Sequence, residues 1–312
     1  YRENYDWTLS KLKDNLSKKT KSLLIPTIVF GTIFSICIYP FSREEGYSRF
    51  QSIGSMIIDP FKHGYWFTLA LFEMFILFYL GDFFLKKKSV KNRTIVWVII
   101  SIVLYVLSFY TTKQYIVENG YFEKTLENYY YLAFNITSLN KTFYYFQWFM
   151  FGILLRKHWN EVVQHIKTGY IITFSLILYI PLLLINRYNS DPIISNITFA
   201  LLGYEAIIIL FSFFYLYQSI SSTEYFWGSG LQAIGKRTLD IYMIHYFFIP
   251  SLLEVGNWFK TPNNDIANKI LPELIVGFVF SLGVIGLCLI ISKIIRMSPF
   301  FSQFLFGSKK EE

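Results

Sequence analysis

The chain has 312 residues, of which 54% are hydrophobic and only 16% are charged, and its formal net charge is +8. A soluble domain of this length needs more charged residues on its surface, so the composition excludes a soluble globular protein. Apolar runs long enough to cross a bilayer recur along the chain. We therefore predict an all-α, polytopic membrane helical bundle that forms a single integral domain over residues 1–312.

Eight apolar runs are predicted to cross the membrane. In chain order they are residues 22–40, 64–85, 94–110, 142–155, 168–186, 196–218, 239–254 and 271–292. The fourth and seventh runs are short for spanning helices. With both termini on one side, that side carries twenty of the 29 lysine and arginine residues, and the opposite side carries nine. Both termini are therefore predicted to be cytoplasmic, and the positive charge indicates topology rather than nucleic-acid binding.

An acidic residue, Glu73, lies near the centre of the second predicted span, roughly 14 Å from its start. An ionisable group at that depth costs about 2.5 to 3.5 kcal/mol, so it needs a partner or a wet cavity. The spacing of His63, Trp66 and Glu73 predicts that they share one helical face, which suits a cavity for a hydroxylated ligand. The alternative is that Glu73 bonds to a neighbouring helix for packing alone.

Two further acids lie within predicted spans. Asp82 is near the cytoplasmic end of its span, where we expect it to reach the headgroup level or pair with Lys86. Glu205 lies near the middle of its span, and we expect it to pair with a group on another helix. A functional role for Glu205 remains the alternative.

Charged residues also mark the start of the seventh run, in the segment "GKRTLDIYMIHYFFIP" at residues 235–250. Thr238 is expected to cap the helix, and Asp240 in the first turn is favoured by the exposed backbone N–H groups. Arg237 and Asp240 are three residues apart and can form an ion pair. Much of this charge therefore has a structural explanation.

A polar stripe follows on the same helix. Tyr242, His245 and Tyr246 fall on one face of an otherwise apolar helix, so we expect that face to point into the bundle. A buried histidine bonded to a tyrosine is one interpretation of His245. The other is a histidine that transfers a proton or binds a ligand, because the free imidazole titrates near neutrality.

Three segments in a fixed order are similar to motifs of a known family. They are "KKTKSLLIP" at 18–26, "GYWFTLALFEMFILFYL" at 64–80 and "LQAIGKRTLDIYMIHYFFIP" at 231–250. Together they resemble the acyltransferase family 3 membrane proteins, which have about ten helices. The resemblance implies transfer of an acyl group, usually acetyl, from cytoplasmic acyl-coenzyme A (acyl-CoA) to a hydroxyl of a cell-envelope or secreted glycan. It also implies a bacterial inner-membrane location.

The resemblance suggests roles for individual residues. The basic groups Lys18, Lys19, Lys21, Lys236 and Arg237 would bind the phosphates of acyl-CoA, and charge that only sets topology is the alternative for each. Acyl-CoA would act as a co-substrate, with no tightly bound cofactor and no metal. The partners would be the lipid bilayer and the acceptor glycan.

The remaining site predictions divide into two groups. The candidate catalytic residues are His245, Tyr242 and Tyr246, and the candidate substrate-binding residues are His63, Trp66 and Glu73.

The family's principal histidine lies in a first helix upstream of the basic run. Here the sequence begins at Tyr1, and only about seventeen residues precede that run. We therefore expect this chain to lack one or two N-terminal helices, and the principal histidine would lie upstream of Tyr1.

Other classes of protein fit the same pattern. Intramembrane acids and a polar stripe also line the substrate pathways of transporters, so a polysaccharide exporter or another non-enzymatic membrane protein is an alternative. An inactive, truncated remnant of an acyltransferase is a further one.

Overall fold

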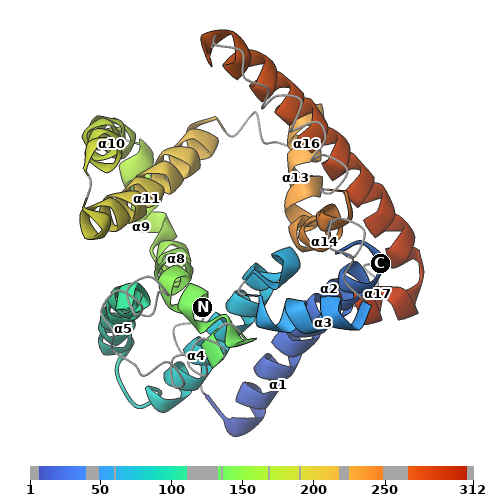
Figure 1. Cartoon of the computed structure of the whole chain (residues 1–312). Helices are drawn as coiled ribbons and strands as arrows, with labels where there is room; N and C mark the ends of the chain where they lie inside the picture. The colour runs from blue at the N-terminus through green and yellow to red at the C-terminus, as the bar shows by residue number, and fades with distance from the viewer. Residues whose placement is uncertain are drawn as a thin grey trace. The chain divides into compact units, whose positions relative to one another are not determined.

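A computed structural model describes most of the chain. The described residues are 7–39, 49–59, 61–110, 133–134, 136–167, 169–189, 191–217, 225–248 and 266–307. They form helices and turns and contain no strand, which confirms the all-α prediction (Figure 1). Two compact units result, Gly152–Lys236 and a larger one made of Arg2–Phe151 with Arg237–Glu312. The single domain over residues 1–312 stays a prediction.

One continuous helical run opens the larger unit. α1 (Leu9–Lys19) passes through the π-helix η1 (Thr20–Leu24) into α2 (Ile25–Cys37). The Thr8 hydroxyl caps α1 by accepting a hydrogen bond from the Lys11 N–H at 3.3 Å. The helix therefore begins well before residue 22, where the apolar run begins. Because α1 is polar, this extension is not part of the apolar run from which the span was predicted.

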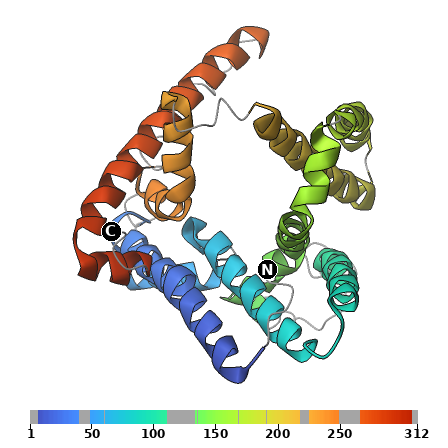
Figure 2. The same ribbon diagram turned by 180° about the vertical axis from the view of Figure 1, so that it is seen from behind.

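Further helices complete the larger unit. They are α3 (Arg49–Ile58), the 3-10 turn η3 (Lys62–Gly64), α4 (Trp66–Phe84), α5 (Val90–Tyr110), α8 (Leu139–Lys157, as far as Phe151), α14 (Thr238–Ile244), the 3-10 turn η4 (His245–Phe247), α16 (Ile266–Met297) and α17 (Pro299–Phe306). α14 packs along α16, and α17 folds back from the end of α16 against α2 (Figures 1 and 2).

The core of the larger unit lies where α2, α14, α16 and α17 meet. Its buried residues are Phe30, Phe34, Tyr65, Met243, Ile244, Cys288 and Phe306. Phe30 stacks on Phe306 with ring centroids 5.6 Å apart. The Tyr65 hydroxyl donates to the carbonyl of Met243 at 3.0 Å, which joins the start of α4 to α14. The core thus connects segments that lie far apart in the sequence.

The smaller unit consists mainly of two long helices side by side. Its helices are α9 (Trp159–Lys167), α10 (Tyr170–Tyr188), α11 (Pro192–Leu216) and α13 (Phe226–Lys236). Asp191 caps α11 by accepting from the N–H groups of Ile193 and Ile194 at 2.8 and 3.3 Å. The Asn186 amide donates to the Thr198 hydroxyl at 3.0 Å and so links α10 to α11.

Six helical runs are long and apolar enough to cross a membrane. They are Leu9–Cys37, Trp66–Phe84, Val90–Phe109, Tyr170–Tyr188, Ile193–Leu216 and Ile275–Met297, counted over the described residues. They coincide with six of the eight predicted spans. The predicted span at 142–155 lies within α8, whose polar residues make it less apolar than these six. The predicted helix at 239–254 ends at Ile244 and continues as η4, and residues 249–254 lie outside the described part.

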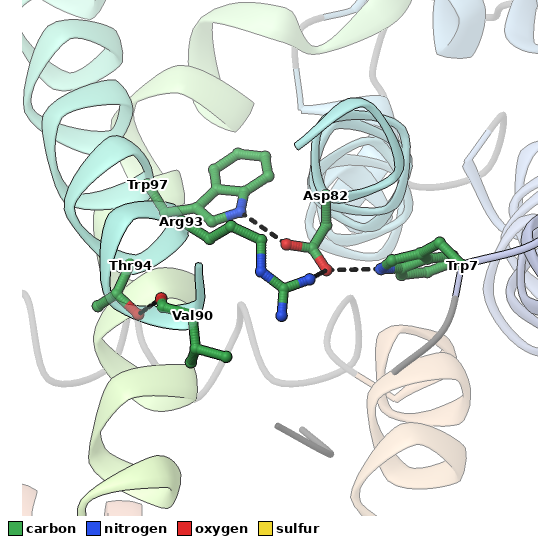
Figure 3. Close-up of polar contacts among 6 residues, drawn as sticks. All are labelled: Trp7, Asp82, Val90, Arg93, Thr94 and Trp97. Atoms are coloured by element: carbon green, nitrogen blue, oxygen red, sulfur yellow. Dashed lines mark hydrogen bonds and ion pairs between the residues drawn. The ribbon is translucent and has the colours of Figure 1, made fainter. Parts of the chain in front are cut away.

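Asp82 joins three segments of the larger unit rather than reaching the membrane surface. Its buried carboxylate accepts from the indole N–H groups of Trp7 at 2.6 Å and Trp97 at 3.3 Å (Figure 3). Arg93 forms an ion pair with it at 3.5 Å. The predicted snorkelling or pairing with Lys86 is wrong, because Asp82 faces the neighbouring α5 and the segment before α1.

Candidate functional site

A cavity of about 330 Å³ lies beside η1 and contains three of the predicted donor-binding lysines. Its lining residues are Asn15, Lys18, Lys19, Lys21, Ser22, Tyr79 and Gly307. The Lys19 ammonium also lies 3.8 Å from the centroid of the Phe75 ring, a cation–π contact. Three ammonium groups around one cavity make a site suited to an anionic, phosphate-bearing ligand.

Local backbone geometry shapes this cavity. The π-helical turn at Thr20–Leu24 widens the helix where Lys21 and Ser22 line the wall, and such turns occur frequently at functional sites. Gly307 ends α17 with a φ of 62°, and a Cβ there would collide with the carbonyl oxygen of Lys21. Only glycine therefore allows the end of α17 to close against η1.

The other two predicted donor-binding residues do not line this cavity. Lys236 ends α13 in the smaller unit. Arg237 lies 3.5 Å from Asp240, which confirms the predicted ion pair. Asp240 receives a two-point contact from Arg296, at 2.7 and 2.8 Å, that the sequence analysis missed because the two residues are distant in the chain. Thr238 is the first residue of α14 and not its cap, since Arg237 occupies the capping position.

The predicted polar stripe faces the interior of the larger unit, as expected. The Tyr242 hydroxyl donates to the Gly64 carbonyl at 2.6 Å and accepts from the Phe67 N–H at 3.3 Å. The Tyr246 ring lies against Gly64, whose φ is 106°, so closely that a Cβ there would collide with it. α14 and η4 are thereby fixed against the start of α4.

His245 is held in one orientation by backbone carbonyls. Its Nδ1 lies 2.7 Å from the Tyr242 carbonyl oxygen and 3.2 Å from that of Ile241. Carbonyl oxygens only accept, so Nδ1 carries the hydrogen and Nε2 of the neutral ring is a proton acceptor. The ring centroid lies 4.0 Å from that of Tyr246. The arrangement orients a half-buried imidazole that can take up a proton.

Trp66 and Glu73 face α8, so their predicted common face is confirmed. The Thr142 hydroxyl donates to the Glu73 carboxylate at 2.6 Å. The Tyr145 ring lies 5.2 Å from that of Trp66, and the Lys141 ammonium lies 4.5 Å from the Trp66 ring. The surface between α4 and α8 therefore combines aromatic rings with hydrogen-bonding groups, a combination typical of ligand sites.

His63 does not share that face, and this part of the prediction is wrong. α4 begins only at Trp66, and His63 precedes it with a φ of 51°. Its ring reaches instead to Ser35 on α2 and Ser55 on α3. The helical spacing fails because Lys62, His63 and Gly64 all have positive φ values, which turn the chain before α4 starts.

Lys62 is a buried cation that the sequence analysis did not single out. It is 4% exposed, and its ammonium donates to the carbonyl of Ile57. Burial lowers the pKa of Lys62 to about 8, while the carboxylates of Asp59 and Glu73 act in the opposite direction. No motif marks this residue, because its burial depends on the turn that precedes α4.

Glu205 differs from its prediction as well. Its Oε2 is buried and has no hydrogen-bond partner among the described residues, so the expected pairing is not observed there. Within the same described ranges, no three His, Cys, Asp or Glu side chains gather in a way that could hold a metal ion. Cys37 and Cys288 are free thiols.

The N-terminal helices are expected upstream of Tyr1, and the structure therefore does not test that expectation. Tyr1 and the five residues after it lie outside the described ranges, which begin at Trp7. The principal histidine expected upstream of Tyr1 therefore stays a prediction. Among the described residues, His245 remains the catalytic candidate with an oriented imidazole.

The helices and sites define a polytopic membrane protein with a basic cavity and a separate cluster of aromatic and imidazole groups. The model of the acyltransferase domain family matches residues 8–293, nearly the whole chain. The chain therefore belongs to acyltransferase family 3, and this membership makes it an acyltransferase. Comparisons with curated proteins and with solved structures gave no match.

Proposed function

We propose that this protein transfers an acyl group, acetyl in the first instance, from cytoplasmic acyl-CoA to a hydroxyl of a cell-envelope or extracellular polysaccharide. It would act in the bacterial inner membrane with both ends of the chain in the cytoplasm. The observation that carries the proposal is the cavity lined by Lys18, Lys19 and Lys21. Acyl-CoA is the acyl donor whose phosphates suit such a cluster of ammonium groups.

The proposal gives each group of residues a different role. The lysines lie just before the predicted apolar span at 22–40, at the end that the positive-inside rule assigns to the cytoplasm. His245 supplies an oriented Nε2 that can take the proton from the acceptor hydroxyl as its oxygen attacks the thioester carbonyl. The C–S bond then breaks, and the same proton passes to the sulfur of the departing coenzyme A. The indole ring of Trp66 would pack against a sugar of the acceptor, and the carboxylate of Glu73 would accept hydrogen bonds from its hydroxyl groups. Tyr242 and Tyr246 hold the histidine segment in place.

The donor site can be tested by binding. Replacing Lys18, Lys19 and Lys21 together with glutamine should weaken CoA binding by at least tenfold, since each charge-assisted hydrogen bond contributes about 1.5 to 3 kcal/mol. Titration calorimetry of the detergent-solubilised protein measures this. Lys13→Gln, on the exposed side of α1, is the matched control and should leave the affinity unchanged. Equal affinity in the triple variant and the control would refute the donor site.

The role of His245 is tested by the transfer reaction itself. His245→Ala should lower O-acetylation of envelope polysaccharide by about 100-fold or more, because general-base catalysis typically contributes 10² to 10⁴. CoA binding and membrane expression should stay at wild-type levels. His158→Ala, which removes an exposed histidine in the smaller unit, is the control. Unchanged acetylation in His245→Ala would show that this histidine contributes to packing and not to the reaction.

A further inference from the structure

The guanidinium group of Arg296, near the end of α16, is fixed by Asp240 at the start of α14. Its Nε donates to one oxygen of the carboxylate at 2.7 Å, and its Nη2 donates to the other oxygen at 2.8 Å. The Ser292 hydroxyl, one turn earlier on α16, donates to the same carboxylate. Asp240 is 2% exposed, so these contacts are shielded from water. A two-point contact fixes the plane of a guanidinium group, which a single hydrogen bond does not.

The same guanidinium group contacts the last residue of α17. Its central carbon lies 4.8 Å from the centroid of the Phe306 ring, within the range of a cation–π contact. Phe306 is 2% exposed and also stacks on Phe30 of α2, with ring centroids 5.6 Å apart. Arg296 therefore joins three helices, because it lies on α16, pairs with α14 and packs on α17.

The end of α17 connects this contact to the wall of the lysine cavity. Gly307 directly follows Phe306, and it lies so close to the Lys21 carbonyl oxygen that a Cβ on it would collide with that oxygen. Gly307 and Lys21 both line the cavity. A planar peptide joins Phe306 to Gly307, so a displacement of the phenylalanine also displaces the glycine. The shape of the cavity wall at Lys21 thus depends on where Phe306 is held.

A helix as short as α17 does not hold its position by itself. It spans eight residues, and isolated helices shorter than about 12 residues are marginal in water, so tertiary contacts decide where it lies. The apolar contacts of Phe306 favour its burial but are non-directional. The fork between Arg296 and Asp240 is directional, and it places a flat cation against the Phe306 ring. Arg296 is therefore the contact that defines the position of Phe306.

We propose that Arg296 is a positioning residue for the lysine cavity. Fixed by Asp240, it holds Phe306 and, through Phe306, the part of the cavity wall that Gly307 forms against Lys21. That the ligand of this cavity is acyl-CoA rests on the proposed function, whereas the positioning of the wall does not. The carboxylate of Asp240 acts on the cavity through Arg296, without any contact with the phosphates of the donor.

Titration calorimetry with CoA separates positioning from a loss of folded protein. Arg296→Lys keeps the positive charge and loses the planar fork. It should weaken CoA binding by about tenfold, the loss expected when one of three ammonium groups no longer reaches a phosphate. The number of binding sites per protein should stay at the wild-type value. Fewer sites with unchanged affinity would overturn the proposal, because that pattern shows only that part of the protein has unfolded.

A second variant tests the contact with α17 and keeps the ion pair intact. Phe306→Leu should weaken CoA binding by a similar factor. Phe146→Leu is the matched control, because it makes the same change at a buried phenylalanine of α8 that does not line the cavity. In the double variant Arg296→Lys/Phe306→Leu the two effects should not multiply, since Arg296 acts through Phe306. Multiplied effects, or equal affinities of Phe306→Leu and Phe146→Leu, would overturn the proposal.

The position of the wall can also be measured without CoA. Ser22 lines the cavity beside Lys21, so the rate at which a charged thiol reagent labels Ser22→Cys reports how closely the wall is shut. The measurement uses the detergent-solubilised protein with Cys37→Ser, which removes the exposed thiol, while Cys288 is buried and stays in place.

The labelling rates distinguish a failure of this proposal from a failure of the proposed function. Arg296→Lys and Phe306→Leu should each raise the labelling rate severalfold, because the end of α17 no longer closes against η1, and Phe146→Leu should not. Unchanged rates in the first two variants would overturn the positioning role. Raised rates, together with a wild type that binds no CoA, would support the positioning role and refute acyl-CoA as the ligand of the cavity.

Discussion

Buried carboxylates of this protein are held by donors from distant parts of the chain. Asp82 accepts from Trp7, 75 positions earlier, and Asp240 from Arg296, 56 positions later. Each carboxylate is 2% exposed, a degree of burial at which an unpaired charge is costly. The pairs therefore connect the helices that carry them, and losing either partner leaves the other buried without compensation.

Asp82→Ala is expected to destabilise the larger unit by about 3 to 5 kcal/mol, since it leaves the Arg93 guanidinium buried without its partner. Thermal unfolding of the detergent-solubilised protein measures the loss as a lower Tm. Asp14→Ala, on an exposed position of α1, is the matched control and should stay within about 0.5 kcal/mol of the wild type. An equal Tm for the two variants would contradict a structural role for the Asp82 cluster.

At the scale of elements, the lysine cavity depends on how two helices meet. The π-turn of η1 widens the helix around Lys21, and the end of α17 closes against it through Gly307. α17 is held there by its own packing, because Phe306 is buried in the core and stacks on Phe30. The shape of the lysine cavity is thus decided by a segment at the other end of the chain from the lysines.

Gly307→Ala should therefore lower CoA affinity, by tenfold or more, because its new methyl group displaces the Lys21 carbonyl and distorts the cavity wall. Gly169→Ala is a close control: Gly169 also has a positive φ, of 74°, but its Cβ would meet nothing within 4 Å. Both variants carry the left-handed strain of about 1 to 2 kcal/mol. Titration with CoA should show a lower affinity for Gly307→Ala and an unchanged affinity for Gly169→Ala. Equal affinities of the two variants would show that α17 does not shape the proposed CoA site.

For the whole molecule, the distribution of basic residues predicts an orientation. Lys87 follows α4 on the predicted cytoplasmic side, and Tyr188 ends α10 on the opposite side. Both side chains are exposed. The proposed transfer from a cytoplasmic acyl donor to a polysaccharide outside the cell requires this orientation, because it would put the lysine cavity and the acceptor on opposite sides of the membrane.

Single cysteines at these two positions test the orientation. In a chain with Cys37→Ser and Cys288→Ala, a membrane-impermeant thiol reagent added to intact cells should label Tyr188→Cys and leave Lys87→Cys unlabelled. Permeabilised cells should give labelling of both, which controls for reactivity. The reverse pattern in intact cells would place the lysine cavity outside and exclude a cytoplasmic donor.

Periodicity and composition predicted a large part of this molecule. Long apolar runs determine helices wherever they occur, so six predicted spans reappear with shifts of a few residues at most ends. The common face of Tyr242, His245 and Tyr246 was also predicted correctly, because spacings of three and four residues keep them on one side of α14 and of the turn η4 that continues it. The same argument failed at His63, where three positive φ values interrupt the helix.

By itself the sequence determined the helical membrane class, the family resemblance and the segments in which charged and aromatic residues are concentrated. Those properties are local, and hydrophobicity or spacing within about twenty residues expresses them. Only the tertiary structure decided which distant partners Asp82, Asp240 and His63 have, and which lysines line a common cavity. Such contacts join residues up to 178 positions apart, as Tyr242 and Gly64 are, and no short-range pattern encodes them.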